Sequence, residues 1–210
     1  MTDLLYLPDS DDVTSFSATV TEATDDYVVL DGTYFYPEGG GQPPDHGKPD
    51  PGTTVEAEID AQRRERLTRM HTAQHVVSRV VLDEYGAGTA GNQVGVERSR
   101  IDFEPADFDG ADLERIERLS NEAIERDHDV VKENRPRERV EREVDEGRAL
   151  LELIPDSVDP LRVVEIDGFD LCPCGGTHVG SLGEVGRVEI VDRSSKGEDT
   201  ERIEFELRSG

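Results

Sequence analysis

The chain has 210 residues, which is enough for one large domain or two small ones with a buried core. Its 49 acidic and 23 basic residues give a formal net charge of -26, spread along the whole length as on a halophile's protein, and this argues against ordinary nucleic-acid binding through clustered lysine and arginine. No stretch approaches the roughly 18 apolar residues of a membrane span and the first residues do not form a signal peptide, so we expect a soluble, cytoplasmic protein.

The first 60 residues carry strand patterns. Alternating apolar residues over 13–31, interrupted by the turn-like Thr24-Asp25-Asp26, predict a β-hairpin. The segment from Phe35 to Gly52 holds so much glycine and proline that regular structure is excluded over most of its length, and 55–59 is again typical of a strand. We therefore predict a small, β-rich, barrel-like N-terminal domain over residues 1–60.

Residues 61–210 combine helical and strand patterns. A helix is predicted over 68–85, with Gly86 and Gly88 as stop signals, and an amphipathic helix over 111–127. Mixed signals over 137–151 include a short helix. Strands are predicted at 93–103 (as a pair), 161–166, 185–192 and 202–207. This order indicates an α+β domain built on an antiparallel sheet, with a helix that carries two histidines.

Those histidines, His71 and His75, are four residues apart, so both side chains project from one helix face, one turn apart, as suits a single metal ion. The apolar stripe of the helix is centred nearly opposite them, which predicts that they lie outside the core. The stripe consists of Met70, Ala73, Val76, Val77, Val80 and Val81. Taken alone, the two histidines fit a solvated or hydrogen-bonded pair at least as well as a metal site.

Cys174 and His178 supply a second half for such a site. They are four residues apart in Cys-Gly-Gly-Thr-His, where freedom in φ at the glycines lets a tight loop aim both side chains at one point. Three histidines and one cysteine complete a tetrahedral shell for one zinc ion, and a histidine-rich shell is compatible with an exchangeable position for water or substrate. Cys172 is an alternative ligand to Cys174, or else a small buried apolar residue. We expect both cysteines to be reduced, because a single intervening residue suits a disulfide poorly.

Two zinc chemistries are excluded by the motifs. HTAQH lacks the glutamate that follows the first histidine in gluzincin-type proteases. PCGGTH is not the Pro-Cys-x-x-Cys of a nucleobase deaminase, and no His-x-Glu accompanies it.

The motifs HTAQH and CGGTH, together with TYFYPEGGGQPPDHG and the turn Ser195-Lys196-Gly197 followed by Arg202-Ile203, resemble the free-standing alanyl-tRNA editing proteins of the AlaX family and the matching domain of alanyl-tRNA synthetase. The resemblance spans the chain. It implies hydrolysis of mischarged Ser-tRNA(Ala), with Gly-tRNA(Ala) as a further candidate, while Ala-tRNA(Ala) is spared. It also implies that one zinc ion is bound by the family's four ligands, with the two helix histidines in the catalytic centre. Those ligands correspond to His71, His75, Cys174 and His178.

Further residues are candidates for contact with the substrate. The resemblance implies that Thr33 corresponds to a threonine near the seryl hydroxyl. Gly39, Gly40, Gly41 and Gln42 would approach the tRNA 3′ end or close the pocket, although the same glycines suit a tight connection that needs positive φ. Lys196 and Arg202 are candidate phosphate contacts, with pairing to surface acids as the alternative. Because counterion release contributes little in molar salt, tRNA recognition would there rest on hydrogen bonds and shape.

The sequence leaves the mechanism and two rival functions open. Bound zinc can lower the pKa of a water to about 7 for attack on the ester, or it can anchor the α-amino group while another water attacks. No aspartate or glutamate stands beside the motifs as an unambiguous base. The rivals are Ser-tRNA(Thr) editing, whose domains share HxxxH and CxxxH, and a non-catalytic, zinc-stabilised RNA-binding module. The glycine-rich segment favours the alanine system.

Overall fold

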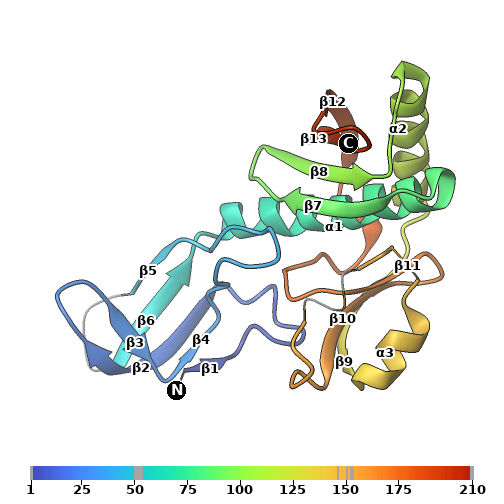
Figure 1. Cartoon of the computed structure of the whole chain (residues 1–210). Helices are drawn as coiled ribbons and strands as arrows, with labels where there is room; N and C mark the ends of the chain where they lie inside the picture. Colours follow the sequence, from blue (N-terminus) through green and yellow to red (C-terminus); the bar gives the residue numbers. More distant parts are fainter. Residues whose placement is uncertain (1, 50–53, 146, 150, 152–153, 209–210) are drawn as a thin grey trace.

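The computed structural model describes residues 2–49, 54–145, 147–149, 151 and 154–208. Its architecture is α+β, and every strand pairing among these residues is antiparallel except for a short parallel contact between β1 (Asp3–Leu4) and β4 (Gly32–Thr33). Figure 1 shows a long helix, α1 (Ala61–Tyr85), running through the middle of the molecule between the sheets. The predicted fold class is confirmed at this level.

The N-terminal sheet follows the order β3-β2-β6-β5 and curls in the lower left of Figure 1. The predicted hairpin is present as β2 (Ser15–Ala23) and β3 (Val28–Leu30), and the next predicted strand as β6 (Thr54–Ile59). A strand within the glycine- and proline-rich segment, β5 (Gly47–Pro49), was not predicted, and residues 50–52 of that segment lie outside the described residues. Alternate side chains form a core of their own: Phe16, Ala18, Leu30, Val55, Ala57 and Ile59.

Helix α1 begins earlier than predicted. Asp60 caps it by accepting the N–H of Arg63 (3.0 Å). The charged residues 63–66 in the first turns lack the apolar spacing from which a helix is predicted. The helix ends at Gly86, which has the left-handed conformation of a C-cap (φ 67°). The prediction that the helix histidines lie outside the core is wrong, because His71 and His75 are only 1% and 4% exposed. Sheet residues cover the valine face and the loop after β11 covers the histidine face, so both sides of α1 are buried.

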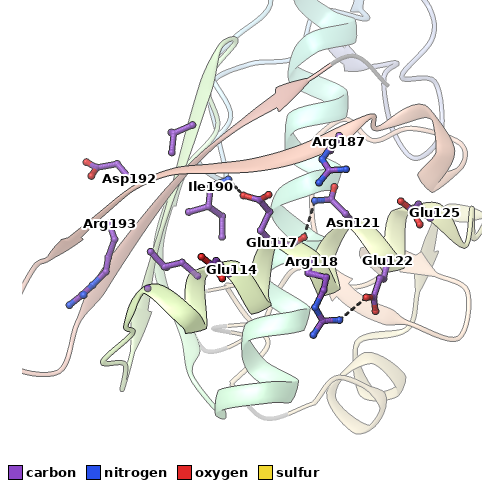
Figure 2. A pocket seen from close by; sticks show the side chains of 13 residues that line it. Glu114, Glu117, Arg118, Asn121, Glu122, Glu125, Arg187, Ile190, Asp192 and Arg193 are labelled. Atoms are coloured by element: carbon purple, nitrogen blue, oxygen red, sulfur yellow. Dashed lines mark hydrogen bonds and ion pairs between the residues drawn. The ribbon is translucent and has the colours of Figure 1, made fainter.

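A four-stranded sheet packs on α1 in the order β12-β13-β8-β7. Its strands are β7 (Gly88–Gln93), β8 (Arg98–Glu104), β12 (Arg187–Ser195) and β13 (Glu201–Arg208). Helix α2 (Gly110–Glu125) lies along the edge strand β12 (Figure 2). Asn121 exchanges two hydrogen bonds with the backbone of Val188 (2.8 and 2.9 Å), and Glu117 accepts the N–H of Ile190 (2.9 Å). The helix thus satisfies an edge that would otherwise be open for pairing.

A smaller sheet, ordered β11-β10-β9, carries the second half of the candidate site. It contains β9 (Val130–Arg135), β10 (Leu161–Ile166) and β11 (Asp170–Pro173), of which only β10 was predicted. The short helix expected within 137–151 is α3 (Arg137–Glu143); residues 146 and 150 of that region lie outside the described residues. After β11 the chain forms the Cys174–His178 loop and a 3₁₀ turn, η2 (Leu182–Glu184). Within the described ranges, no helix has both the length and the apolarity that crossing a membrane requires.

Candidate metal centre

Four side chains from two distant parts of the chain converge. His71 and His75 come from α1, while Cys174 and His178 come from the loop after β11, and one ligand atom from each lies within 4.8 Å of all the others. Cys174 Sγ lies 3.5 Å from His71 Nε2 and 3.3 Å from His178 Nε2. Tetrahedral zinc with ordinary bond lengths of about 2.3 Å to sulfur and 2.05 Å to nitrogen would set such pairs roughly 3.6 Å apart. The two contacts of Cys174 therefore have the spacing of neighbouring ligands in a metal shell, and the four residues together could hold one ion.

The tautomer of His71 is fixed by Gln42, which reaches in from the glycine-rich segment. Gln42 Oε1 lies 2.7 Å from His71 Nδ1 and also accepts the backbone N–H of Thr177 at 3.0 Å. Because a backbone N–H can only donate, the shared amide atom must be oxygen, and Nδ1 of His71 must carry the proton. The lone pair of His71 then lies on Nε2, the nitrogen that faces Cys174.

His178 is oriented in the same way by Thr72. The Thr72 hydroxyl donates its only proton to the C=O of Thr68 (3.0 Å) and accepts the N–H of Val179 (3.2 Å). Its oxygen lies 3.1 Å from His178 Nδ1, so that nitrogen must be a donor and Nε2 is again left free. Both imidazoles thus turn an unprotonated nitrogen toward the centre, as metal-binding histidines do.

His75 faces a buried ion pair. Its Nδ1 lies 3.5 Å from Asp170 Oδ2, at the outer limit of a hydrogen bond, and has no closer partner among the described residues. Arg148 binds the same carboxylate through Nε (2.6 Å) and Nη2 (2.5 Å). Burial alone would raise the pKa of Asp170, but Arg148 holds it well below its usual range, so a carboxylate stands behind the third imidazole.

The two cysteines have opposite environments. Burial raises the pKa of the Cys172 thiol to about 12, and its sulfur is not part of the four-residue cluster. Burial would also raise the pKa of Cys174, but His71 and His178 hold it well below its usual range. Of the two ligands that the sequence allowed, Cys174 is therefore the one with thiolate character at the centre.

Gly176 lets the loop press against His71. A Cβ at this position would stand 2.1 Å from His71 Cε1 and 2.8 Å from Gln42 Oε1. Its φ is not positive, and neither is that of Gly175. The expectation that φ freedom shapes this loop is therefore wrong: at Gly176 the requirement is close approach.

Comparison with known proteins places this site in a family. Residues 161–204 match the family model described as the threonyl and alanyl tRNA synthetase second additional domain. The alanyl-tRNA editing protein AlaX-M of Methanosarcina acetivorans is 34% identical over a 244-residue alignment that covers 99% of each chain. The AlaX-M protein of Methanosarcina barkeri is also 34% identical, over 242 residues and 99% of each chain. The chain belongs to the AlaX family of alanyl-tRNA editing proteins.

Synthetases contain a related region. The alanine–tRNA ligase of Methanopyrus kandleri is 37% identical over 86% of this AlaX chain, but the match covers only 23% of the ligase. The ligase of Halobacterium salinarum is 35% identical over 85% of this chain and 22% of its own length. The AlaX chain thus corresponds to about a quarter of a synthetase.

The glycine-rich loop of this AlaX chain is a tight turn docked on the end of β7. Gly39 and Gln42 exchange backbone hydrogen bonds of 3.1 and 2.9 Å, and Gly40 and Gly41 have positive φ (56° and 82°). The C=O of Gly41 accepts the N–H of Val94 at 2.7 Å. This backbone conformation accounts for Gly40 and Gly41, while Gln42 is the residue that reaches the centre.

Three other predicted site residues lie apart from the candidate metal centre. Thr33 is half-buried on β4, where its Oγ1 accepts the N–H of Phe35 (3.1 Å), and no hydrogen bond links it to the four candidate ligands in the described structure. Lys196 is exposed on the β12–β13 turn. Arg202 forms a bidentate ion pair with Asp102 (2.6 and 2.8 Å), the surface pairing that the sequence offered as its alternative.

Sequence reasoning missed the residues that orient the ligands. Thr72 and Thr177 are polar residues inside the motifs HTAQH and CGGTH. Their position next to the candidate ligands was the signal that could have identified them. Asp170 and Arg148 carry no motif, and they can be found only once β11 is placed beside α1.

Proposed function

We propose that this chain hydrolyses the ester bond of Ser-tRNA(Ala), with Gly-tRNA(Ala) as a second candidate substrate, and spares Ala-tRNA(Ala). The observation that carries the proposal is the convergence of three imidazoles and one thiolate within 4.8 Å, with Nε2 of His71 and His178 left free. The relatives named as alanyl-tRNA editing proteins support the substrate class. In the reaction, water adds to the ester carbonyl carbon, the bond to the ribose oxygen breaks, and that oxygen takes up a proton.

We propose zinc as the metal, held by His71, His75, Cys174 and His178. Three nitrogens and one sulfur suit zinc, and the partners behind the imidazoles are those expected around a zinc ligand. When bound, the ion supplies Lewis-acid chemistry, either by making a water acidic or by holding the substrate's α-amino group. Gln42 and Thr72 keep the two imidazoles in the metal-binding tautomer, and Gly176 lets the loop reach His71.

Rejection of alanine requires a buried polar group that only serine satisfies. Thr33 is the candidate from the family resemblance. A second candidate is the hydroxyl pair of Thr89 and Ser78, joined by a 3.1 Å hydrogen bond, with Ser78 one turn after His75 on α1. Gln74 lies one turn before Ser78, and its buried Oε1 has no partner among the described residues. Comparing Thr33→Val with Thr89→Val separates the two, because only the correct change abolishes the preference for seryl over alanyl ester.

For the tRNA we propose contacts at Gly39–Gln42, Lys196 and Arg202, and a division into a β-rich N-terminal domain (1–60) and an editing domain (61–210). Lys196 is the more available of the two cations, because Arg202 would first have to release Asp102. In molar salt these contacts work through hydrogen bonds more than through counterion release.

A deacylation assay in high salt tests the function. Ser-tRNA(Ala), Gly-tRNA(Ala), Ala-tRNA(Ala) and Ser-tRNA(Thr) are compared with and without a chelator. Chelator-sensitive release of serine from tRNA(Ala) is expected, with Cys174→Ala inactive and Cys172→Ala active as its matched control. Selective hydrolysis of Ser-tRNA(Thr) would favour the threonine system. A chain that binds tRNA(Ala) and zinc without hydrolysing any substrate would be the non-catalytic module, and the proposal would be wrong.

A further inference from the structure

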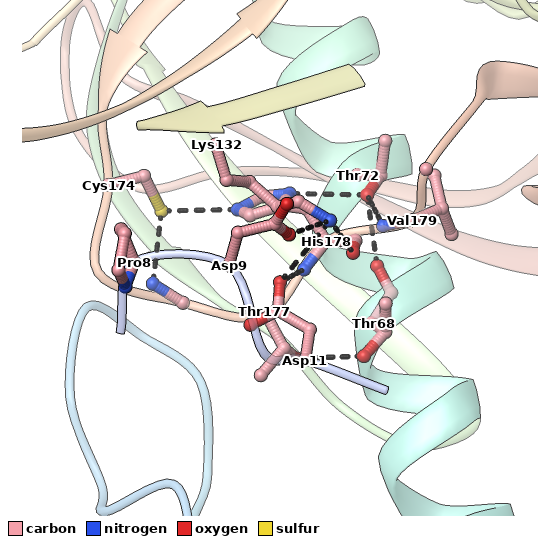
Figure 3. Close-up of polar contacts among 12 residues, drawn as sticks. Pro8, Asp9, Asp11, Thr68, Thr72, Lys132, Cys174, Thr177, His178 and Val179 are labelled. Carbon is pink, nitrogen blue, oxygen red and sulfur yellow. Dashed lines mark hydrogen bonds and ion pairs between the residues drawn. The ribbon is translucent and has the colours of Figure 1, made fainter. Parts of the chain in front are cut away.

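Three charged side chains hold the backbone of the loop that carries Cys174 and His178. They are Asp11 from the N-terminal segment and Lys132 from β9, both labelled in Figure 3, and Arg162 from β10; we call them the backbone clamp. The Asp11 carboxylate accepts the N–H of His178 at 2.9 Å. Lys132 Nζ donates to the C=O of His178 at 3.3 Å. Both backbone groups of this ligand residue are therefore bound by charged side chains.

Arg162 holds the other end of the loop. One nitrogen, Nη1, donates to the C=O of Cys174 (2.7 Å) and of Gly176 (2.8 Å). Its Nε donates to the C=O of Pro8 at 2.7 Å, and Nη2 lies 3.4 Å from Asp11. A single guanidinium thus ties the ligand loop to the N-terminal segment.

The clamp is well buried although its members are charged. The side chains of Asp11 and Arg162 are each 6% exposed and that of Lys132 is 9% exposed. Burying charges is costly, and replacing buried charged groups by well-packed apolar residues is often neutral or stabilising. Here the charged groups form hydrogen bonds to the backbone of a loop whose two glycines have no side chains to fix its conformation. The arrangement suits the control of loop geometry.

We propose that the clamp couples the N-terminal segment, residues 8–11, to metal binding, with Asp11 as a positioning residue that pre-organises Cys174 and His178. This rests on the metal centre of the proposed function, but not on its substrate. Coupling between two sites is reciprocal. If the seated segment strengthens metal binding, bound metal must in turn hold the segment in place.

The first test measures Zn²⁺ affinity of the full chain in high salt by competition with a chromophoric chelator, without tRNA. Loss of a residue that supports a metal ligand typically weakens affinity about 10- to 100-fold, and this is expected for Asp11→Ala. Asp11→Asn keeps the shape and one acceptor oxygen, so a smaller loss is expected. Asp12→Asn is the matched control: Asp12 is exposed, and no hydrogen bond or ion pair of its side chain is found within the described residues. Its affinity should equal that of the wild type.

The second test uses the wild-type chain alone, so it holds even if Asp11→Ala fails to fold. Amide hydrogen exchange of residues 9–14 is followed with and without Zn²⁺, and slower exchange with metal is expected. The proposed coupling would be wrong if Asp11→Ala bound Zn²⁺ as tightly as the wild type. It would also be wrong if amide exchange of this segment were the same with and without Zn²⁺. Neither result bears on deacylation. Conversely, if Zn²⁺ affinity depends on Asp11 as expected but the chain hydrolyses no aminoacyl-tRNA, only the proposed function would be refuted.

Discussion

Replacing Gly176 by alanine should disrupt the proposed metal centre through a single methyl group. A Cβ at this position would stand 2.1 Å from His71 Cε1 and 2.3 Å from His71 Nδ1. Non-bonded carbons come no closer than about 3.5 Å without strain, so the loop or the imidazole must move by more than about 1 Å. Metal sites tolerate deviations of only about 0.2 Å in ligand distance. The shift is therefore several times larger than the site can absorb.

We expect Gly176→Ala to lower the free energy of unfolding by about 1–3 kcal/mol, the usual cost of an overpacked core. Zinc affinity should fall by about tenfold or more, because His71 also loses its alignment with Gln42. Denaturant unfolding in high salt measures the first quantity, and a chelator competition measures the second.

Gly175→Ala is the control in the same loop, since a Cβ there meets nothing within 4 Å. Its stability should stay within about 0.5 kcal/mol of the wild type. If Gly176→Ala bound zinc as tightly as the wild type, or if both variants behaved alike, the close approach of the loop to His71 would not be what requires glycine.

Three further predictions concern charges. Asp45→Ala should lower the free energy of unfolding by about 3–5 kcal/mol, because it leaves the buried Arg64 guanidinium unpaired. Glu122→Ala removes the exposed pair with Arg118 and should lower it by less than about 1 kcal/mol; equal losses would contradict this. Arg202 lowers the pKa of Asp102 in the folded chain, so the pair stabilises the fold fully above the unfolded pKa of about 3.9, and this stabilisation is lost as the pH falls through the folded pKa. The stability difference between the wild type and Asp102→Asn should therefore shrink between about pH 5 and 2. A constant difference would refute this prediction. The melting temperature should rise from 0.1 M to 2 M KCl as salt screens the net charge of -26, and a flat response would argue against salt adaptation.

Periodic apolar patterns accounted for much of the fold. The hairpin β2–β3, strand β6, helix α2 and the pair β12–β13 each alternate or repeat in a way that burial enforces. The elements that were missed lack that signal. Only two of the six residues of strand β9 are apolar, Val130 and Val131, so the sequence shows no alternation there. The strand forms because β10 pairs with it. Residues 63–66 in the first turns of α1 are all charged, and they are helical because Asp60 caps the helix before them and the buried part of the helix continues after them.

The four candidate ligands were predictable, but their surroundings were not. Two i,i+4 pairs of ligand-type residues indicate the centre without any knowledge of the fold, and only the choice between Cys172 and Cys174 needed the structure. The carboxylate that holds His178 belongs to Asp11, one of 49 acidic residues, in a run that resembles ordinary solvated surface. A helical wheel also misjudged the histidines, because it assumes that one face of α1 meets solvent, while loop and sheet cover both.

The separation of these residues along the chain bears on what a part of it could do. The segment that matches the synthetase family model, residues 161–204, contains Arg162, Cys174 and His178 but neither histidine of α1. It therefore supplies half a shell, held on a loop whose backbone depends on Asp11 and whose Thr177 depends on Gln42. Gln42 and Asp11 both come from the first 60 residues and act on different atoms of the site. The N-terminal residues are accordingly part of the architecture of the proposed metal centre, and a fragment lacking them should bind zinc more weakly even where it keeps all four candidate ligands.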